Sequence, residues 1–389
     1  MSPIQNSIQL PSLNNPTVED ILRYKWEEFK NTHLVREIEE KEVEKMLLCR
    51  SGMNGIFVYT CEKCYRTVYQ LLGCNSRLCT RCGKRYTDQW SKKLAKRLSN
   101  VPHRHFVFSI PSQLWSYLKQ DRSLWKVYMD SVIETIDDYF PKIIHNPKIR
   151  VGVIVVFHPF GKDMKFQPHL HLIITEGGFL KGRFIPKKFI PARKLAKSWQ
   201  YHVSKNLQEA GLPNHLFTKI YKKYDGFYVW VHRAGRIDNP VDIIKYIGRY
   251  IRHPAIANSR IVSFDGKTVE FYYEREDADG NKTTHYVKMY VDEFISNLIQ
   301  HIPERQFRMI RHYGAYARTL KRFFFSIQST ITFEFQDILY MPGWKCKPYC
   351  PHCGGRLKFD RFETIPPPDD DFHWKVKKEN LVRFEYMMN

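Results

Sequence analysis

Two histidines separated by one residue are the first group in this sequence that could bind a metal ion. His169 and His171 lie in the run PHLHLIIT, which is rich in aliphatic and β-branched residues. Because side chains alternate between the two faces of a β-strand, both imidazoles project from one face and Leu170 projects from the other. Two adjacent imidazoles form half of a site for a divalent cation. Surface histidines on an ordinary strand would give the same pattern.

A third histidine stands close to this pair in the sequence. His158 follows the apolar run VGVIVVF and lies eleven residues before His169. A continuous apolar run of this length is typical of a strand that is buried on both faces. Three imidazoles would hold one divalent cation and leave coordination positions open for a substrate oxygen.

A predicted helix over residues 240–252 supplies two candidate nucleophiles. Tyr246 and Tyr250 are four residues apart and therefore share one helix face, and Arg249 and Arg252 flank them. A tyrosine hydroxyl attacks a phosphodiester only when it is positioned or deprotonated, and arginine stabilises the charge on the phosphoryl oxygens. The alternative interpretation is that the two rings only pack against the core.

Paired cysteines predict a structural zinc site near the N-terminus. Cys61 and Cys64 form one CxxC pair, and Cys79 and Cys82 form a second pair fourteen residues later. Four thiolates at this spacing bind one tetrahedral zinc ion and leave no coordination position open for catalysis. The remaining cysteines of this region, Cys49 and Cys74, are either buried small side chains or spare ligands. Basic residues around the pairs are candidate DNA contacts, namely Arg77, Arg81, Lys84 and Arg85.

A second, smaller group of cysteines lies near the C-terminus. Cys346, Cys350 and Cys353 supply three ligands of a possible second zinc site, because the last two form another CxxC pair. A tetrahedral zinc ion needs four ligands, and no fourth is evident, although His373 is a candidate.

Composition restricts the class of protein. The chain of 389 residues has a formal net charge of +22, which favours a polyanion such as nucleic acid as its partner. No signal peptide and no apolar stretch long enough to span a membrane is visible. Cysteines clustered in CxxC pairs indicate zinc binding in a reducing compartment, not a disulfide framework.

Five stretches carry a resemblance to a known family: CNSRLCTRC at 74–82, HPFG at 158–161, PHLH at 168–171, YIGRY at 246–250 and RHYG at 311–314. The His-Leu-His strand and the paired-tyrosine helix resemble the HUH endonuclease superfamily. The order of cysteine pairs, histidine strand and tyrosine helix resembles the rolling-circle transposases of the insertion sequence 91 family. The resemblance covers roughly Cys49 to Arg318.

The resemblance implies an α+β fold with a ferredoxin-like palm, in which a central antiparallel sheet carries the histidines and the nucleophile helix packs nearby. It implies three domains: a helical and zinc-binding domain at 1–100, a catalytic domain at 101–320 and a C-terminal region at 321–389. The cofactor would be Mg²⁺ or Mn²⁺ at His158, His169 and His171. The substrate would be single-stranded DNA at transposon ends and targets, cut to a 5′-phosphotyrosine and a free 3′-OH.

Several alternatives stay open at this point. Other members of the superfamily place Gln or Glu at the third ligand position, so Gln167 and Glu176 compete with His158. A plasmid replication initiator or relaxase would share the chemistry, and a non-catalytic zinc DNA-binding protein would leave the histidines and tyrosines structural. No GxxxxGK[ST] motif is present, so strand opening would need a host helicase or the replication machinery. We expect a prokaryotic, cytoplasmic and nucleoid-associated protein, monomeric or dimeric.

Overall fold

The computed structural model describes residues 13–95, 98–99, 101–187, 190–231, 255–276, 281–317 and 349–365. The chain divides into two compact units. Unit 1 comprises Met1–Gly83, Pro254–Ile302 and Thr332–Asn389, and unit 2 comprises Lys84–His253 and Pro303–Ile331. The two units therefore interleave along the chain, because strands from distant segments pair within each unit.

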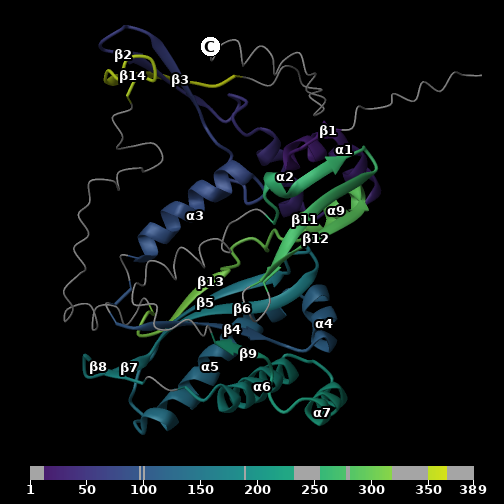
Figure 1. The fold of residues 1–389 in the computed structure, drawn as a ribbon, viewed down its shortest axis with the longest axis vertical. Helices are drawn as coiled ribbons and strands as arrows, with labels where there is room; N and C mark the ends of the chain where they lie inside the picture. The colour runs from purple at the N-terminus through teal and green to yellow at the C-terminus, as the bar shows by residue number, and fades with distance from the viewer. Residues whose placement is uncertain are drawn as a thin grey trace, which may run out of the picture. The chain divides into compact units, whose positions relative to one another are not determined.

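Unit 2 is built on a five-stranded antiparallel sheet with the order β13-β5-β6-β4-β9 (Figure 1). Its strands are β4 (His103–Ser109), β5 (Gly152–Phe160), β6 (Phe166–Thr175), β9 (Val229–Val231) and β13 (Ile310–Gly314). The predicted α+β fold with a central antiparallel sheet is confirmed. The apolar run that precedes His158 forms most of β5, and the His-Leu-His run lies in β6 beside it.

Helices cover one face of this sheet, as Figure 1 shows for α5 (Leu124–Ile144) and α6 (Ala192–Glu209). Leu170 and Leu172 of β6 are fully buried in this core, together with Trp199 of α6. Shorter elements complete the unit: η1 (Ser112–Leu114), α4 (Trp115–Gln120), α7 (Asn214–Lys223) and the hairpin of β7 (Gly177–Leu180) and β8 (Arg183–Pro186). The leucines of β6 thus anchor the strand and turn its histidines to the opposite face.

The opposite face of the sheet is apolar at one end only. There Ile154 and Ile173 pack against Leu94, which lies near the end of α3 (Thr80–Ala95). Tyr316 completes this small cluster, and its hydroxyl lies 2.5 Å from His103 Nε2. The histidines of β5 and β6 lie farther along the same face, beyond the apolar cluster, because they continue the alternation of Ile154, Val156 and Ile173.

Unit 1 contains several helices and a four-stranded sheet with the order β1-β10-β11-β12. Apolar residues recur at helical spacing over residues 17–46, which predicts a helix there. This stretch forms two helices, because the chain is extended at His33 and again at Arg36. Thr17 caps the first helix through a reciprocal pair of hydrogen bonds with Asp20. The elements are α1 (Val18–Thr32), α2 (Glu37–Leu47), β1 (Leu13–Asn14), η2 (Asn258–Arg260), β10 (Ile261–Phe264), β11 (Thr268–Glu276), β12 (Lys282–Tyr290) and α9 (Val291–Ile299).

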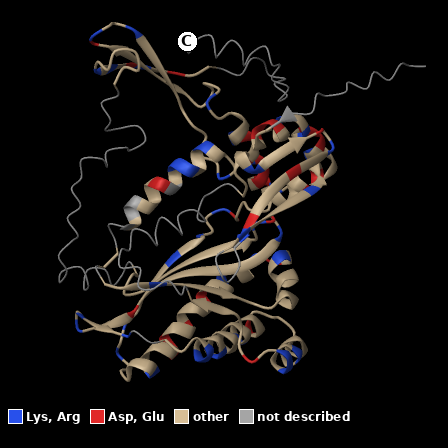
Figure 2. Ribbon diagram, in the orientation of Figure 1, with Lys and Arg blue, Asp and Glu red and all other residues tan. Residues whose placement is uncertain are grey.

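A separate three-stranded sheet of unit 1 joins both ends of the chain, in the order β14-β2-β3. Its strands are β2 (Ile56–Cys61), β3 (Thr67–Leu71) and β14 (Leu357–Glu363). Figure 2 shows acidic residues along α1 and α2 and basic residues on α7. Within the described residues, no helix is long and apolar enough to cross a membrane.

Candidate metal centres and nuclease site

Three histidines converge on the open face of the unit 2 sheet. His158 of β5 and His169 of β6 are direct cross-strand partners, and His171 lies two residues farther along β6. One ring nitrogen from each of the three lies within 4.8 Å of the others. The rings of His158 and His169 meet edge to face, with 4.8 Å between their centroids. The structure therefore brings together the three histidines that the sequence singled out.

Hydrogen bonds define which nitrogen of His169 is available. Its Nδ1 lies 2.7 Å from the backbone carbonyl oxygen of Gln167, which can only accept a hydrogen bond. Nδ1 therefore carries the proton, and Nε2 keeps its lone pair and faces Nδ1 of His158 at 3.1 Å. In metal-binding imidazoles, the ring nitrogen that does not bind the metal usually donates its proton to a carbonyl or carboxylate oxygen in the same manner.

A fourth histidine, His105, was missed in the sequence. It lies on the neighbouring strand β4, is 1% exposed, and its Nε2 lies 3.0 Å from Nδ1 of His171. The two rings stack with 5.2 Å between centroids. The signal that could have found it is the alternation of His103 and His105 in a strand that pairs with β6, but only the register of β4 against β6 places His105 beside His171.

Burial favours the neutral form of His169 and His171. Removal from water lowers the pKa of His169 below its usual value. The pKa of His171 is held well below its usual range, first by burial and then by the neighbouring charges of His169, His105 and His158. Neutral imidazole is the form that binds a metal ion.

The two competitors for the third ligand position point elsewhere. Glu176 is 3% exposed and forms an ion pair with Arg104, with 2.6 Å between Nε and Oε1. It follows the end of β6 that lies away from His169. The Gln167 side chain lies against Gly161, since a Cβ on that glycine would be 2.6 Å from Gln167 Oε1. Tyr246, Tyr250, Arg249 and Arg252 lie outside the described residues.

The cysteines of unit 1 form two four-thiol clusters, and neither has the ligand set expected from spacing. Cys79 and Cys82 join Cys49 and Cys74, with Cys49 Sγ 3.6 Å from Cys79 Sγ and 3.7 Å from Cys82 Sγ. Zinc–sulfur bonds of about 2.3 Å in a tetrahedron place neighbouring sulfurs roughly 3.8 Å apart. The observed separations therefore fit a tetrahedral zinc ion.

The second cluster joins cysteines from opposite ends of the chain. Cys61 Sγ lies 3.5 Å from Cys353 Sγ, and Cys64 Sγ lies 3.7 Å from Cys350 Sγ. Pairing of β14 with β2 places Leu357 opposite Cys61. This pairing brings Cys350 and Cys353 close to Cys61 and Cys64. The backbone N–H groups of Lys63 and Cys64 donate to Cys61 Sγ, and the latter bond is the main cause that lowers the pKa of that thiol to about 6.

The pairing of Cys61 and Cys64 with Cys79 and Cys82 in one site was therefore wrong, because sequence spacing does not include partners brought by strand pairing. Cys49 and Cys74 belong to a complete ligand set, and the second cluster needs no histidine. Cys346 lies outside the described residues.

The other predicted DNA contacts are on the surface: Arg81, Lys84 and Arg85 are exposed on α3, and Arg77 is half-buried. Arg81, Lys84 and Arg85 share one helix face.

Comparisons with known proteins match both regions. The family described as "Transposase zinc-binding domain", named for insertion sequence 91, matches residues 21–110, and the family described as "Putative transposase" matches residues 152–322. The transposase for insertion sequence element IS801 of Pseudomonas savastanoi pv. phaseolicola is 28% identical over 302 residues, covering 72% of this chain and 70% of that protein. The chain belongs to the insertion sequence 91 family of transposases.

Two further similarities were found. A protein of Sinorhizobium fredii described as "Putative transposase y4qJ" is 24% identical over 326 residues, covering 77% of this chain and 80% of that protein. The crystal structure of the non-structural protein 1 N-terminal origin-recognition/nickase domain of human bocavirus is 12% identical, with a TM-score of 0.22, and covers 49% of this chain and 72% of that domain. The zinc-binding domain and the cysteine clusters confirm structural zinc as a cofactor of this transposase.

Proposed function

We propose that this transposase nicks single-stranded DNA at transposon ends and rejoins strands through a 5′-phosphotyrosine intermediate. The convergence of His158, His169 and His171 on one face of the sheet carries the proposal, because three imidazoles hold a divalent cation and leave positions open. Membership of a transposase family supports DNA as the substrate.

The three histidines fit a divalent cation by the chemistry of their donors. They are half-buried or buried, and His169 and His171 are held in orientation by Gln167 and His105. When bound, the cation would polarise the scissile phosphodiester as a Lewis acid. Imidazole nitrogen suits Mn²⁺ better than Mg²⁺, which prefers oxygen ligands, so we expect higher affinity for Mn²⁺.

Tyr246 and Tyr250 are the proposed nucleophiles. The Oη–P bond of the attacking tyrosine forms as the bond between phosphorus and the 3′ oxygen breaks. The tyrosine proton is lost to water, and the leaving oxygen takes up a proton to become a 3′-OH. Arg249 and Arg252 would stabilise the charge on the phosphoryl oxygens. Attack of another 3′-OH on the phosphotyrosine reverses the step, so two tyrosines would hold two strands in alternation.

The two cysteine clusters would each hold one structural zinc ion. We propose that Cys49, Cys74, Cys79 and Cys82 hold the first and that Cys61, Cys64, Cys350 and Cys353 hold the second. The exposed face of α3 that carries Arg81, Lys84 and Arg85 would contact DNA phosphates beside the first zinc site. Since the sequence has no P-loop motif, a host helicase or replication would supply the single strand.

Covalent capture tests the proposal. Protein is incubated with oligonucleotides that carry candidate element ends, in Mn²⁺, Mg²⁺ or chelator, and analysed on denaturing gels. The label must be at the 3′ end, because the phosphotyrosine retains the 3′ fragment, whereas a 5′ label reports the released 3′-OH fragment. We expect a denaturant-resistant adduct with the metals and none with chelator.

Substitutions assign the residues. The Tyr246→Phe/Tyr250→Phe variant and the His169→Ala/His171→Ala variant should form no adduct. The matched control is Tyr201→Phe/Tyr228→Phe, because both of these tyrosines are exposed in unit 2. An adduct that persists in the first variant, or one that forms equally well in chelator, would contradict the proposed roles.

A further inference from the structure

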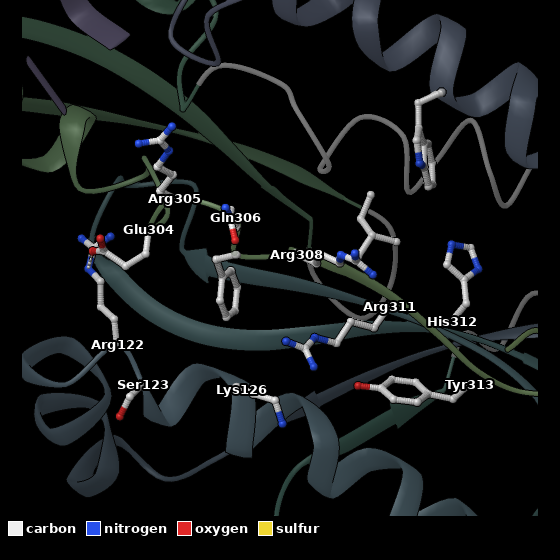
Figure 3. Close-up of a pocket in the computed structure, with 13 residues that line it drawn as sticks. Arg122, Ser123, Lys126, Glu304, Arg305, Gln306, Arg308, Arg311, His312 and Tyr313 are labelled. Atoms are coloured by element: carbon white, nitrogen blue, oxygen red, sulfur yellow. Dashed lines mark ion pairs between the residues drawn. The ribbon is translucent and has the colours of Figure 1, made fainter. Parts of the chain in front are cut away.

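A cleft of about 1030 Å³ lies along the edge strand β13 of the unit 2 sheet (Figure 3). The residues labelled in Figure 3 come from three segments: residues 122–126 at the start of α5, the loop over residues 304–308, and β13 itself. We call it the edge-strand cleft. Five of its side chains are cationic and one is acidic: Arg122, Lys126, Arg305, Arg308 and Arg311 against Glu304.

Three of the cations already share two acidic partners. Arg122 lies 3.8 Å from Glu304. Lys126 and Arg311 both pair with Asp130 of α5, at 2.7 Å and 2.9 Å. These pairs hold the wall of the cleft and leave little positive charge for a ligand.

Arg305 and Arg308 are different. Both are exposed, and neither forms an ion pair with any residue in the described part of the chain. Two guanidinium groups in a cleft without acidic partners form a site for anions, and guanidinium matches the geometry of phosphate oxygens.

Backbone pairing of β13 with β5 places one wall of the cleft beside the strand that carries His158. The Phe157 N–H donates to the Met309 carbonyl oxygen at 2.9 Å, which brings the chain at Arg308 alongside His158. Met309 belongs to the core on the helix-covered face, whereas Ile310 packs on the histidine face. The loop of residues 304–308 therefore runs toward the strand end that carries His158.

We propose that the edge-strand cleft binds the DNA strand on one side of the scissile phosphate, with Arg305 and Arg308 on successive backbone phosphates. This inference rests on the proposed nicking function, because that function supplies the scissile phosphate at the histidine site. Trp90 and His312 also line the cleft and give a base two surfaces for stacking. Stacking needs unpaired bases, so the ligand is single-stranded DNA, not a duplex.

Binding titrations test the cleft without any nicking. Fluorescence anisotropy of a labelled oligonucleotide is followed against the full chain in chelator at several salt concentrations. Loss of two phosphate contacts lowers the slope of log K against log salt by about 1.4, since each contact on single strands contributes about 0.7. The Arg305→Gln/Arg308→Gln variant should therefore bind roughly tenfold more weakly at about 0.15 M salt and roughly a hundredfold more weakly at about 0.03 M.

A matched control removes the same charge elsewhere. Lys181→Gln/Arg183→Gln alters two exposed cations of the β7–β8 hairpin in the same unit and should leave the slope near that of the parent. The Arg305→Lys/Arg308→Lys variant should restore most of the slope. Equal slopes for the two Gln variants, or equal affinity for a duplex of the same sequence, would overturn the inference. If the slopes differ while the parent forms no adduct, the cleft stands and the nicking proposal fails.

Discussion

Combining cysteine substitutions tests which thiols share a zinc ion. Three double variants each remove one CxxC pair: Cys61→Ser/Cys64→Ser, Cys79→Ser/Cys82→Ser and Cys350→Ser/Cys353→Ser. With two zinc ions per chain, each variant should retain one, because each pair supplies half of one cluster. The first and third variants combined should still retain one zinc ion, whereas the first and second combined should retain none.

The size of the effect follows from the number of ligands. Structural zinc sites with four ligands bind with about 10–16 kcal/mol of apparent free energy. If two of four thiolates supply about half of that, roughly 6 kcal/mol remains, which corresponds to a dissociation constant of tens of micromolar. Zinc held so weakly is lost on desalting, so the stoichiometry should change by whole ions.

The assay is elemental analysis of protein purified without chelator and then desalted, with circular dichroism to verify the remaining fold. Cys346→Ser is the control and should retain two zinc ions, because both clusters already have four thiols. Two results together would refute the proposed partition. One is complete zinc loss when Cys61, Cys64, Cys350 and Cys353 are all replaced. The other is retention of one zinc ion when the first and second double variants are combined.

Three further predictions concern unit 2. His105→Ala should weaken Mn²⁺ binding roughly 10- to 100-fold in calorimetry, because the orientation of His171 is lost; an unchanged affinity would show that His105 only fills space. Burial lowers the pKa of His103 to about 4 from 6.5, so the unfolded chain binds the proton first on acidification. The contribution of neutral His103 to the free energy of unfolding is complete above pH 6.5 and should fall by about 3 kcal/mol as the pH is lowered to 4. In urea melts, the His103→Gln variant should therefore show a smaller pH dependence of stability than the parent. Gly314→Ala should destabilise the unit by more than about 3 kcal/mol, because its φ is +53° and a Cβ would lie 1.9 Å from the Val151 carbonyl oxygen. Gly211→Ala, where φ is +103° and nothing lies within 4 Å, should cost less in the same melts.

The RHYG stretch illustrates how a motif gains a physical meaning only in three dimensions. Arg311 and the Tyr313 hydroxyl both bind Asp130, which fastens β13 to α5. Gly314 permits the close approach to Val151, and His312 is left to line the cleft. Three of the four residues therefore hold the edge strand in place, a role that their spacing does not reveal.

Local patterns predicted elements better than they predicted boundaries. The apolar run before His158 and the alternation around Leu170 gave β5 and β6, because strand periodicity is a property of adjacent residues. The helical pattern over residues 17–46 was broken by a contact that is distant in sequence: Arg36 donates to the Ile302 carbonyl oxygen, 266 residues away, and also binds Glu39. Periodicity is insensitive to such a contact.

The sequence by itself determined the strand that presents His169 and His171 together, the CxxC pairs as zinc ligands and the basic character of the surface, since each depends on residue type and short spacing. The tertiary structure decided which thiols share a cluster and that His105 supports His171. Both depend on strand register: β14 pairs with β2 across nearly the whole chain, and β4 pairs with β6. Such pairing is selected by burial and hydrogen bonding over the entire fold, so spacing along the chain does not encode it locally.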